Sequence, residues 1–298
     1  MHDVYAYGVI APSTLIELSG DFPAPGGYAE IAGVYPSIGG EAAGGAYVLA
    51  RLGVATKLHG NLLRDDDSSA QVLELLSAAG VDCSAVGVQP GVAPVTEVVL
   101  ATGDGRTVLG TYGKLTADAA WSDPSQEDIR TSRIVCLDPF FSEESHRAAR
   151  WCVETGTPYV TVDTSPDSEI ARSAAVLIDS EEFAARTFET SDPHEVHAAY
   201  TRQCSGLVIL TRGSRPLVDG GRGEQPQECR PFLVQTRDTT GAGDSFRAGI
   251  IYGMLRGYDR KRLVRTACAV AAIVCQRPPG VLNSPTEQEL VEFLDRHA

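Results

Sequence analysis

The middle of the chain alternates short apolar runs with helical stretches, and this alternation restricts the possible folds more than any other feature. The runs are Ile134–Leu137, Tyr159–Val162, Val176–Ile178 and Leu207–Leu210. The helical stretches that separate them are Ser142–Glu154, Glu181–Phe188 and Glu195–Gln203. Strands that are separated by helices pair in parallel, with helices on both faces. The pattern therefore predicts an α/β fold with a doubly wound, mainly parallel sheet flanked by helices.

The same kind of pattern continues toward both ends of the chain. Further strands are predicted at Val4–Ile10 and Ala55–His59. Further helices are predicted at Tyr47–Leu52, Asp66–Ala79, Leu263–Cys275 and Glu287–His297. Asp66–Ala79 has its apolar residues on one face, as a helix packed on a core requires.

Two segments, at about 12–38 and 92–114, interrupt the α/β alternation with short alternating strands. Within the second, Pro94–Ala101 and Arg106–Thr111 flank the turn Thr102-Gly103-Asp104-Gly105, which is typical of a β-hairpin. Each segment is too small to fold alone. We therefore predict one domain, 1–298, in which these segments form a small β lid over the end of the sheet.

Composition and charge exclude several classes of partner. The formal net charge is −14 and the pI about 4.8, whereas nucleic acid and anionic membranes bind cationic surfaces. No apolar run approaches the roughly 18 residues that a membrane helix needs, and the N-terminus does not resemble a signal peptide. The seven cysteines are scattered and contain no CxxC. Scattered cysteines of this kind favour reduced thiols and a cytoplasmic location.

A glycine-rich turn, Asp238-Thr239-Thr240-Gly241-Ala242-Gly243-Asp244, stands before a helical stretch near the C-terminus. The apolar run Phe232-Leu233-Val234 before it predicts a strand, so the order is strand, tight turn, helix. Free amides at a helix N-terminus bind anions. The alternatives are an ordinary glycine-rich turn and a degenerate dinucleotide fingerprint, but Phe246 occupies the third glycine position of the fingerprint. The pattern thus indicates a phosphate site with the Asp244 carboxylate beside it, and disfavours a nicotinamide-dependent oxidoreductase.

The stretch Asp238–Asp244 closely resembles the C-terminal signature of the PfkB (ribokinase-like) family of carbohydrate kinases. A second signature of that family matches Gly39-Gly40 followed by Arg51-Leu52-Gly53. Smaller matches at Thr211-Arg212-Gly213-Ser214 and Ala269–Ala272 fall in family order. The resemblance covers essentially the whole chain. It implies an ATP-dependent phosphotransferase that phosphorylates a hydroxyl of a sugar or sugar-like small molecule.

The resemblance implies roles for the glycine turn. Asp244 is the expected catalytic base, and Gly241, Ala242 and Gly243 are the expected anion hole for the transferred phosphoryl group. Phosphoryl transfer depends mainly on positioning and charge stabilisation, so a strong base is not needed. Because a helix N-terminus lowers the pKa of a nearby carboxylate, we expect Asp244 to stay ionised.

The resemblance also implies where ATP and cations bind. Asp179 and Glu182 stand where the family carries an N-x-x-E motif that organises Mg²⁺ and phosphate, although a helix N-cap with acidic residues in the first turn is the structural alternative. Asp179 replaces the family's Asn, keeps an oxygen acceptor and adds a charge. Thr211 and Gly213 match positions that line the ATP site in the family. Asp238 and Thr240 match positions that help to hold a monovalent cation (K⁺).

The acceptor end is where the chain departs from the family. Sugar-binding members carry an Asp where this chain has Ser13, and an Asn where it has Gly44. Gly39, Gly40 and Asp138 complete the expected acceptor-binding set, although Asp138 is equally compatible with a turn at a strand end. Arg247 lies one helical turn beyond Asp244 on the same face. A contact with phosphate or with an acidic group of the substrate is one alternative, and a position at the surface is the expected one.

These departures leave three functions open. The chain can be a sugar kinase, a nucleoside or inositol kinase of the same family, or a non-catalytic ligand-binding or regulatory protein on the kinase fold. By analogy with the family, the lid strands are expected to pair between subunits in a homodimer.

Overall fold

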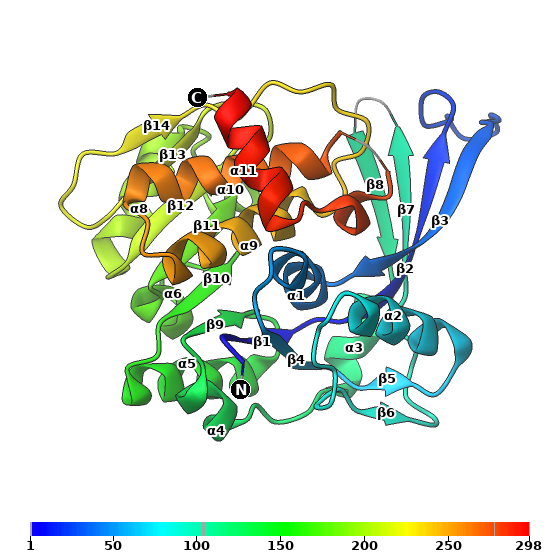
Figure 1. Cartoon of the computed structure of the whole chain (residues 1–298), viewed down its shortest axis with the longest axis horizontal. Coiled ribbons are helices and arrows are strands. Elements are labelled where there is room, and N and C mark those ends of the chain that lie inside the picture. The colour runs from blue at the N-terminus through cyan, green and yellow to red at the C-terminus, as the bar shows by residue number, and fades with distance from the viewer. Residues whose placement is uncertain (1, 103–104, 277, 298) are drawn as a thin grey trace.

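The computed structural model describes residues 2–102, 105–276 and 278–297. Within these residues, the largest sheet has eight strands in the spatial order β14-β13-β12-β11-β10-β9-β1-β4 (Figure 1). Neighbours from β4 to β12 are parallel, whereas β13 and β14 are antiparallel. This confirms the predicted mainly parallel sheet. The strands are β1 Val4–Gly8, β4 Thr56–Gly60, β9 Ile134–Leu137, β10 Tyr159–Val162, β11 Val176–Ser180, β12 Leu207–Thr211, β13 Leu217–Gly220 and β14 Gln227–Cys229.

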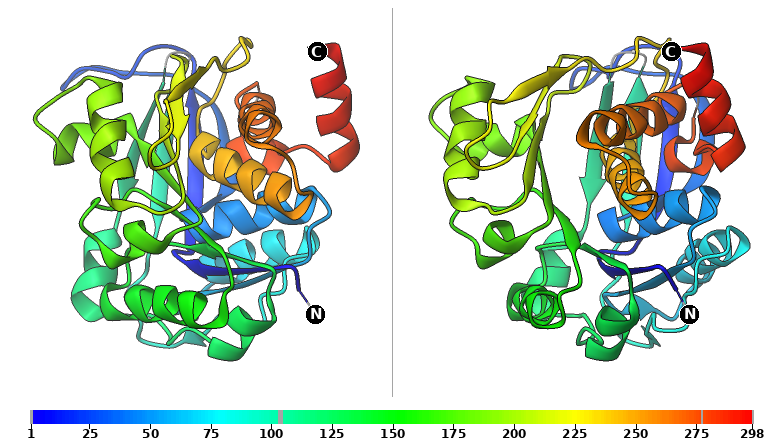
Figure 2. Two further views of the ribbon diagram at one scale, coloured as in Figure 1. Left: turned by 90° about the vertical axis from the view of Figure 1, so that its left-hand side faces the viewer. Right: turned by 60° about the vertical axis from the view of Figure 1, so that its left-hand side comes forward.

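Helices cover both faces of this sheet, as Figure 2 shows from the side. One face carries α1 Glu41–Arg51, α2 Asp67–Ala78, α9 Ala242–Leu255, α10 Arg260–Val274 and α11 Glu287–Arg296. The other carries α3 Tyr112–Asp118, α4 Gln126–Thr131, α5 Ser142–Thr155, α6 Glu169–Ser173, α7 Glu181–Thr187 and α8 Pro193–Gln203. Side chains alternate across each strand, so Val4 and Ala6 of β1 join the first core, and Tyr5 and Tyr7 join the second.

The two interrupting segments pair with one another in a small four-stranded sheet of the described residues, in the order β3-β2-β7-β8. Its strands are β2 Ala11–Leu18, β3 Ile31–Gly39, β7 Glu97–Thr102 and β8 Gly105–Gly110. It stands beside the main sheet, at the right of Figure 1. The predicted hairpin is present as β7 and β8, and its turn residues 103–104 lie outside the described residues. A short pair, β5 Leu63–Arg64 and β6 Val88–Gln89, lies apart from both sheets.

Two predictions about local structure were wrong. Phe232–Val234 is not a strand, because Pro231 cannot donate to a sheet ladder; Phe232 instead packs its ring on Phe293 of α11, and Leu233 is exposed. The helix predicted to start at Tyr47 begins at Glu41. Two glycines in its first turns weaken the helical signal of the sequence, and packing of the helix against α9 outweighs their low propensity.

The described residues include no helix that is both long and apolar enough to cross a membrane. The carboxyl ends of β1 and β9, the start of α1, the start of α9 and one edge of the small sheet meet at one place. Ligands of open α/β sheets bind at such an edge. This is the candidate site.

Candidate active site

The glycine turn forms the start of α9. Gly241 is the N-cap, with φ of 72°, a left-handed conformation that favours glycine. A Cβ at Gly241 would also lie 2.2 Å from the Val281 side chain. The first amides of a helix have no intrahelical acceptor, although the Ala242 amide donates to the Thr239 carbonyl at 3.2 Å. Gly243 is exposed, and a Cβ there would meet open space. The turn therefore presents backbone to a ligand and has no side chain to block it.

Asp244 lies in the first turn of α9 and faces α1. A Cβ built on Gly44 would lie 2.9 Å from Asp244 Oδ2. Its carboxylate has no hydrogen bond to another side chain within the described ranges. Burial raises the pKa of Asp244 to about 7, and the charges of Asp138 and Glu97 add to the rise. The expectation that Asp244 stays ionised because of the helix dipole was wrong. Loss of solvation outweighs the dipole here.

The residues Gly39 and Gly40 join β3 to α1. Gly40 is the N-cap of α1 with φ of 85°, and a Cβ there would lie 2.4 Å from the Val9 carbonyl oxygen. A Cβ on Gly39 would lie 2.9 Å from Glu97 Oε1 and 3.2 Å from Ser13 Cβ. The absence of side chains at this glycine pair thus allows the small sheet, the end of β1 and the start of α1 to pack closely.

Ser13 is buried on β2, opposite Glu97 of β7 in the strand register. Its hydroxyl donates to Glu97 Oε1 at 2.8 Å, and the Tyr112 hydroxyl donates to Glu97 Oε2 at 2.6 Å. Glu97 and Tyr112 were missed in the sequence, because nothing in a hairpin pattern shows which strand residue faces Ser13.

Asp138, expected to contact the acceptor, is fully buried together with Arg247. Its Oδ1 accepts from Arg247 at 2.6 Å, while its Oδ2 accepts from the amides of Val9 and Ala42 at 2.8 and 3.0 Å. The Arg247 guanidinium also donates to the Glu41 carbonyl. The expectation of a surface Arg247 was therefore wrong. The Asp138–Arg247 ion pair thus connects β1, β9, α1 and α9 next to Asp244.

Glu41, the first residue of α1, was missed because the helix was predicted to begin six residues later. Burial raises its pKa to about 8, and the charges of Asp138 and Asp244 contribute in the same direction. A signal for Glu41 was present in the sequence. It is a carboxylate directly after the Gly39-Gly40 pair, where the acceptor was expected to bind.

The small sheet contacts the glycine turn directly. Arg106 of β8 donates to the Thr239 carbonyl at 2.8 Å and to its hydroxyl at 3.2 Å. Arg237, just before the turn, pairs with Glu17 of β2 at 2.8 Å. Two ion-pairing or hydrogen-bonding contacts thus hold the small sheet against the loop that carries Asp244, and Arg106 brings a positive charge to it.

Asp238 and Thr240 lie side by side under the turn, and both are buried. Asp238 Oδ1 accepts from the Thr240 amide at 2.8 Å. Within the described part of the chain, Asp238 Oδ2 and Thr240 Oγ1 have no hydrogen-bond partner. Buried oxygens without partners are costly.

Asp179 and Glu182 lie near one another in the chain but differ in environment. Asp179 is fully buried on the α8 side of β11, near Tyr200, and burial raises its pKa to about 8. The expectation that Asp179 adds a charge was wrong, because at neutral pH the buried carboxyl is mostly protonated. The N-cap of α7 is Ser180, not Asp179. Glu182 is exposed in the first turn of α7.

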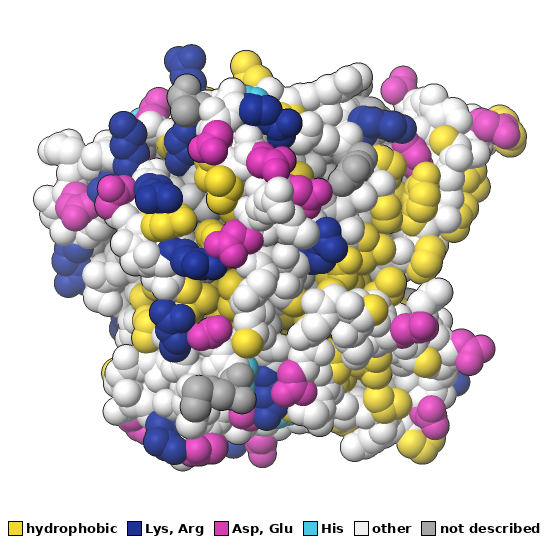
Figure 3. Space-filling view, in the orientation of Figure 1, with side chains coloured by type: hydrophobic (Ala, Val, Ile, Leu, Met, Phe, Trp, Pro, Cys, Tyr) yellow, Lys and Arg dark blue, Asp and Glu magenta, His cyan; other side chains and the backbone are white. Residues whose placement is uncertain are grey.

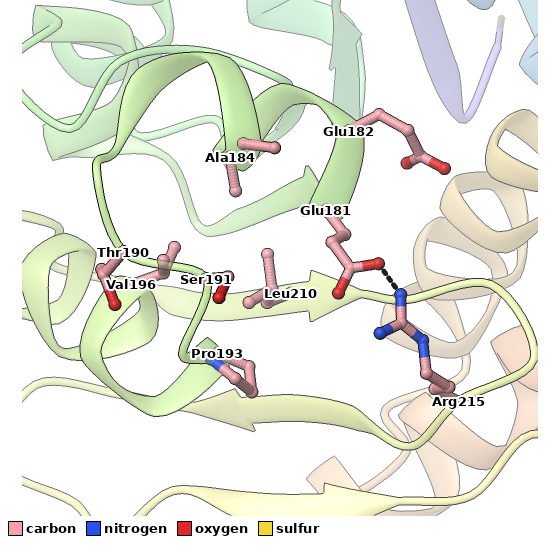
Figure 4. Close-up of a pocket in the computed structure, with 10 residues that line it drawn as sticks. Glu181, Glu182, Ala184, Thr190, Ser191, Pro193, Val196, Leu210 and Arg215 are labelled. Atoms are coloured by element: carbon pink, nitrogen blue, oxygen red, sulfur yellow. Dashed lines mark hydrogen bonds and ion pairs between the residues drawn. The ribbon is translucent and has the colours of Figure 1, made fainter.

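A pocket of about 350 Å³ lies along α7 (Figure 4). Glu181 and Arg215, which both line it, form an ion pair, while Glu182 points away from Val196 and Leu210. Thr211 ends β12 and donates to the Asp179 carbonyl at 3.2 Å, and Gly213 turns the chain with φ of 60°. The structure therefore brings Thr211 to the Asp179 backbone, whereas the Asp244 carboxylate lies against Gly44 of α1.

Comparison with known proteins gives a consistent result. Residues 1–287 match the model of the pfkB family carbohydrate kinases. A nucleoside kinase of Methanothermobacter thermautotrophicus is 26% identical over 97% of this chain and 94% of its own length. An ATP-dependent ribose-1-phosphate kinase of Halopiger xanaduensis is 30% identical over 86% of each chain.

Solved structures share the fold. A putative ribokinase from Agrobacterium tumefaciens superposes with a TM-score of 0.85 at 24% identity, covering 99% of this chain and 98% of its own. A putative ribokinase II from E. coli in complex with ATP and Mg²⁺ has a TM-score of 0.79 at 19% identity, with both chains fully covered. The sequence match over nearly the whole length shows that this chain belongs to the pfkB family of carbohydrate kinases.

Proposed function

We propose that this protein transfers the γ-phosphoryl group of ATP to a hydroxyl of a sugar or sugar-like small molecule. The observation that carries the proposal is the geometry at the start of α9. There the turn Gly241–Gly243 presents backbone amides, and the Asp244 carboxylate stands one residue further on without a side-chain partner among the described residues. A carboxylate held beside an anion site, with no structural partner, is suited to receive a proton from an attacking hydroxyl.

The reaction begins with the acceptor hydroxyl against Asp244. A pKa of about 7 lets Asp244 be ionised in part of the molecules at neutral pH and still accept a proton well, as general-base catalysis requires. The hydroxyl oxygen attacks the γ-phosphorus in line, the bond to the bridging oxygen breaks, and ADP leaves. The amides of the glycine turn and the Arg106 guanidinium stabilise the charge on the transferred group.

Three sets of residues would hold the cofactors. Thr211 and Gly213 would line the ATP site. Glu182 would organise Mg²⁺, with protonated Asp179 in the uncharged role of the Asn that the family carries there. Asp238 and Thr240 would hold a K⁺ ion, which would offset the negative charge under the anion site. Bound Mg²⁺ would neutralise charge on the ATP phosphates.

The small sheet would act as a lid and as a dimer interface. Ile31 and Val34 on β3, and Val108 and Leu109 on β8, are exposed, and Figure 3 shows hydrophobic side chains gathered over this sheet. A second copy that pairs its own small sheet would cover them. Light scattering at micromolar concentration is expected to give twice the monomer mass, and a monomer would contradict the dimer.

The central test is Asp244→Asn in a coupled assay of ADP release, with a panel of pentoses, hexoses, nucleosides and inositols. Loss of a general base costs typically 10²–10⁴-fold in turnover, so we expect near-complete loss with ATP binding retained. Asp118→Asn, which changes an exposed carboxylate on α3, is the matched control.

Turnover of the Asp244→Asn variant at the wild-type rate would refute the assignment of the base. The nucleosides belong in the panel because a nucleoside kinase is among the relatives. Tight binding of one compound without ADP release from any acceptor would favour the non-catalytic ligand-binding protein instead.

A further inference from the structure

Two cysteine thiols meet where the edge of the main sheet packs on α10. Cys229 is the last residue of β14, the strand at one end of the sheet, and its side chain is half-buried. Cys268 lies in α10 and is buried. The Cys268 thiol donates a hydrogen bond to the Cys229 sulfur, and both side chains belong to the same core cluster. Both cysteines are free thiols in this structure.

A second contact shows that the chain after β14 runs along α10. The Arg265 guanidinium lies over the ring of Phe232, 4.2 Å from the ring centroid. Arg265 stands one helical turn before Cys268 on the same face of α10, and Phe232 comes three residues after Cys229. Residues 229–232 are therefore aligned with residues 265–268 at two points. The backbones on both sides, and not one side-chain rotamer, hold the two thiols together.

The two thiols differ in their chemistry. The hydrogen bond from Cys268 lowers the pKa of Cys229 by more than burial raises it, and the Arg265 charge also lowers it. The same hydrogen bond, together with burial, raises the pKa of Cys268. Peroxides oxidise thiolates, and redox-sensing cysteines combine an accessible thiolate with a neighbouring thiol that resolves the oxidised sulfur. Cys229 has the properties of the first group and Cys268 those of the second.

We propose that Cys229 and Cys268 form a reversible disulfide when the protein meets hydrogen peroxide. The Cys229 thiolate attacks one peroxide oxygen, the O–O bond breaks, and hydroxide leaves a sulfenic acid on Cys229. The Cys268 sulfur then attacks the Cys229 sulfur. The S–O bond breaks, and the departing oxygen takes the proton of the Cys268 thiol and leaves as water. The two sulfurs are oxidised, the peroxide is reduced to water, and a dithiol reductant restores both thiols.

The disulfide would act on the glycine turn through the connector, residues 230–237. The far end of the connector is already attached to α10, because the amides of Arg237 and Asp238 donate to the Cys275 carbonyl at 2.9 and 3.3 Å. The disulfide would attach its near end to the same helix. Arg237 also pairs with Glu17 of the small sheet. Oxidation would therefore restrain the segment that connects the small sheet to the turn.

The movement that the bond requires falls on β14 and the connector. The sulfurs must approach from contact to a bond of about 2.05 Å. α10 cannot easily move, because Ala267 packs so closely on α9 that a Cβ on Gly249 would lie 2.6 Å from its Cα. β14 has three residues and pairs with one strand only, β13. Since the connector leads into the turn that carries Asp244, oxidation is expected to lower ADP release. This effect on activity rests on the kinase activity proposed above, whereas the disulfide does not.

The test is a peptide map of the whole protein before and after hydrogen peroxide. Reduced protein is treated with an increasing molar excess of peroxide, the remaining thiols are alkylated, and the digest is analysed by mass spectrometry. We expect a Cys229–Cys268 cross-linked peptide, the loss of these two free thiols, and the return of both with dithiothreitol. ADP release, measured on the same samples, is expected to fall on oxidation and to recover on reduction.

Three variants assign the roles. Cys229→Ser should form no disulfide and should keep Cys268 as a free thiol. Cys268→Ser keeps a hydrogen-bond donor but cannot resolve, so oxidation should stop at a Cys229 sulfenic acid that dimedone traps. Cys83→Ser removes a half-buried thiol that hydrogen-bonds to Ser77, and it should form the disulfide as the wild type does. All three should release ADP at the wild-type rate when reduced.

The outcomes separate the two proposals. In the wild type, a sulfinic acid on Cys229 beside a free Cys268, a disulfide with another partner, or oxidation of Cys83 before Cys229 overturns the disulfide. This result needs no variant and no activity, so it stands even if a variant fails to fold. A disulfide that leaves ADP release unchanged overturns the link to the glycine turn. Absence of ADP release from the reduced protein overturns the proposed kinase and leaves the disulfide standing.

Discussion

Replacing Gly44 with Ala should separate stability from activity. Gly44 lies in the interior of α1, where glycine costs roughly 0.5–1 kcal/mol relative to alanine. The new Cβ, however, would lie 2.9 Å from Asp244 Oδ2 and 3.2 Å from both Cγ and Cβ of Asp244. Rotation of the carboxylate cannot relieve the contact with Cβ, because that atom is fixed to the α9 backbone. Asp244 must therefore move by a few tenths of an ångström.

The expected cost falls on turnover. Overpacking of a tight contact costs about 1–3 kcal/mol, which corresponds to roughly a 5- to 150-fold fall in rate if the whole strain is borne by the catalytic base. The gain in helix propensity offsets much of this strain in the free energy of unfolding. We therefore expect kcat to fall within that range and the melting temperature to stay within a few degrees of wild type. Steady-state ADP release and a calorimetric melt measure the two quantities on one preparation.

The adjacent residue supplies the control. A Cβ on Gly45 would lie 3.6 Å or more from Arg247 and Cys136, which is ordinary packing distance. Gly45→Ala gains the same helix propensity, so it should be as active as wild type and slightly more stable. Wild-type kcat in Gly44→Ala, or an equal loss in Gly45→Ala, would refute the reasoning that Gly44 exists to make room for Asp244.

Three further outcomes follow from the charges of the site. Because burial raises the pKa of Asp244 to about 7, kcat/KM should rise with pH through about 7 and then level; a profile flat from pH 5.5 to 8 would contradict a base in this environment. Burial raises the pKa of Asp179 to about 8 in the folded protein, so the folded state holds this proton more tightly than the unfolded chain does. The stability that comes from this difference is fully present below the unfolded pKa and is lost as the pH rises to about 8. The free energy of unfolding of Asp179→Asn should therefore rise relative to wild type between pH 5 and 8, by up to about 1.4 kcal/mol per pH unit; a difference that stays constant in denaturant unfolding across this range would count against it. Arg106→Ala should lower kcat/KM by about tenfold or more through loss of charge at the glycine turn, with Arg202→Ala, an arginine on α8, as the control; unchanged kinetics would show that the contact with Thr239 is only structural.

The succession of apolar runs and helices was enough to predict the layers and the parallel sheet. The reason is that strand and helix periods are local properties, and short connections leave few ways to assemble them. The glycine turn and Asp244 could also be found, because a left-handed N-cap and a following acid are encoded in consecutive residues. Where the chain lacked such a local signal, as at Phe232–Val234 after Pro231, the prediction failed.

The charges of the candidate site were decided by the tertiary structure alone. Nothing near Arg247 in the sequence shows that it is buried against Asp138, which comes 109 residues earlier. Nor does the sequence show that Glu97 faces Ser13, or that Arg106 reaches Thr239 across 133 residues. The pKa values of Asp244, Glu41 and Asp179 follow from desolvation, which depends on what surrounds a group in three dimensions and not on its neighbours in the chain.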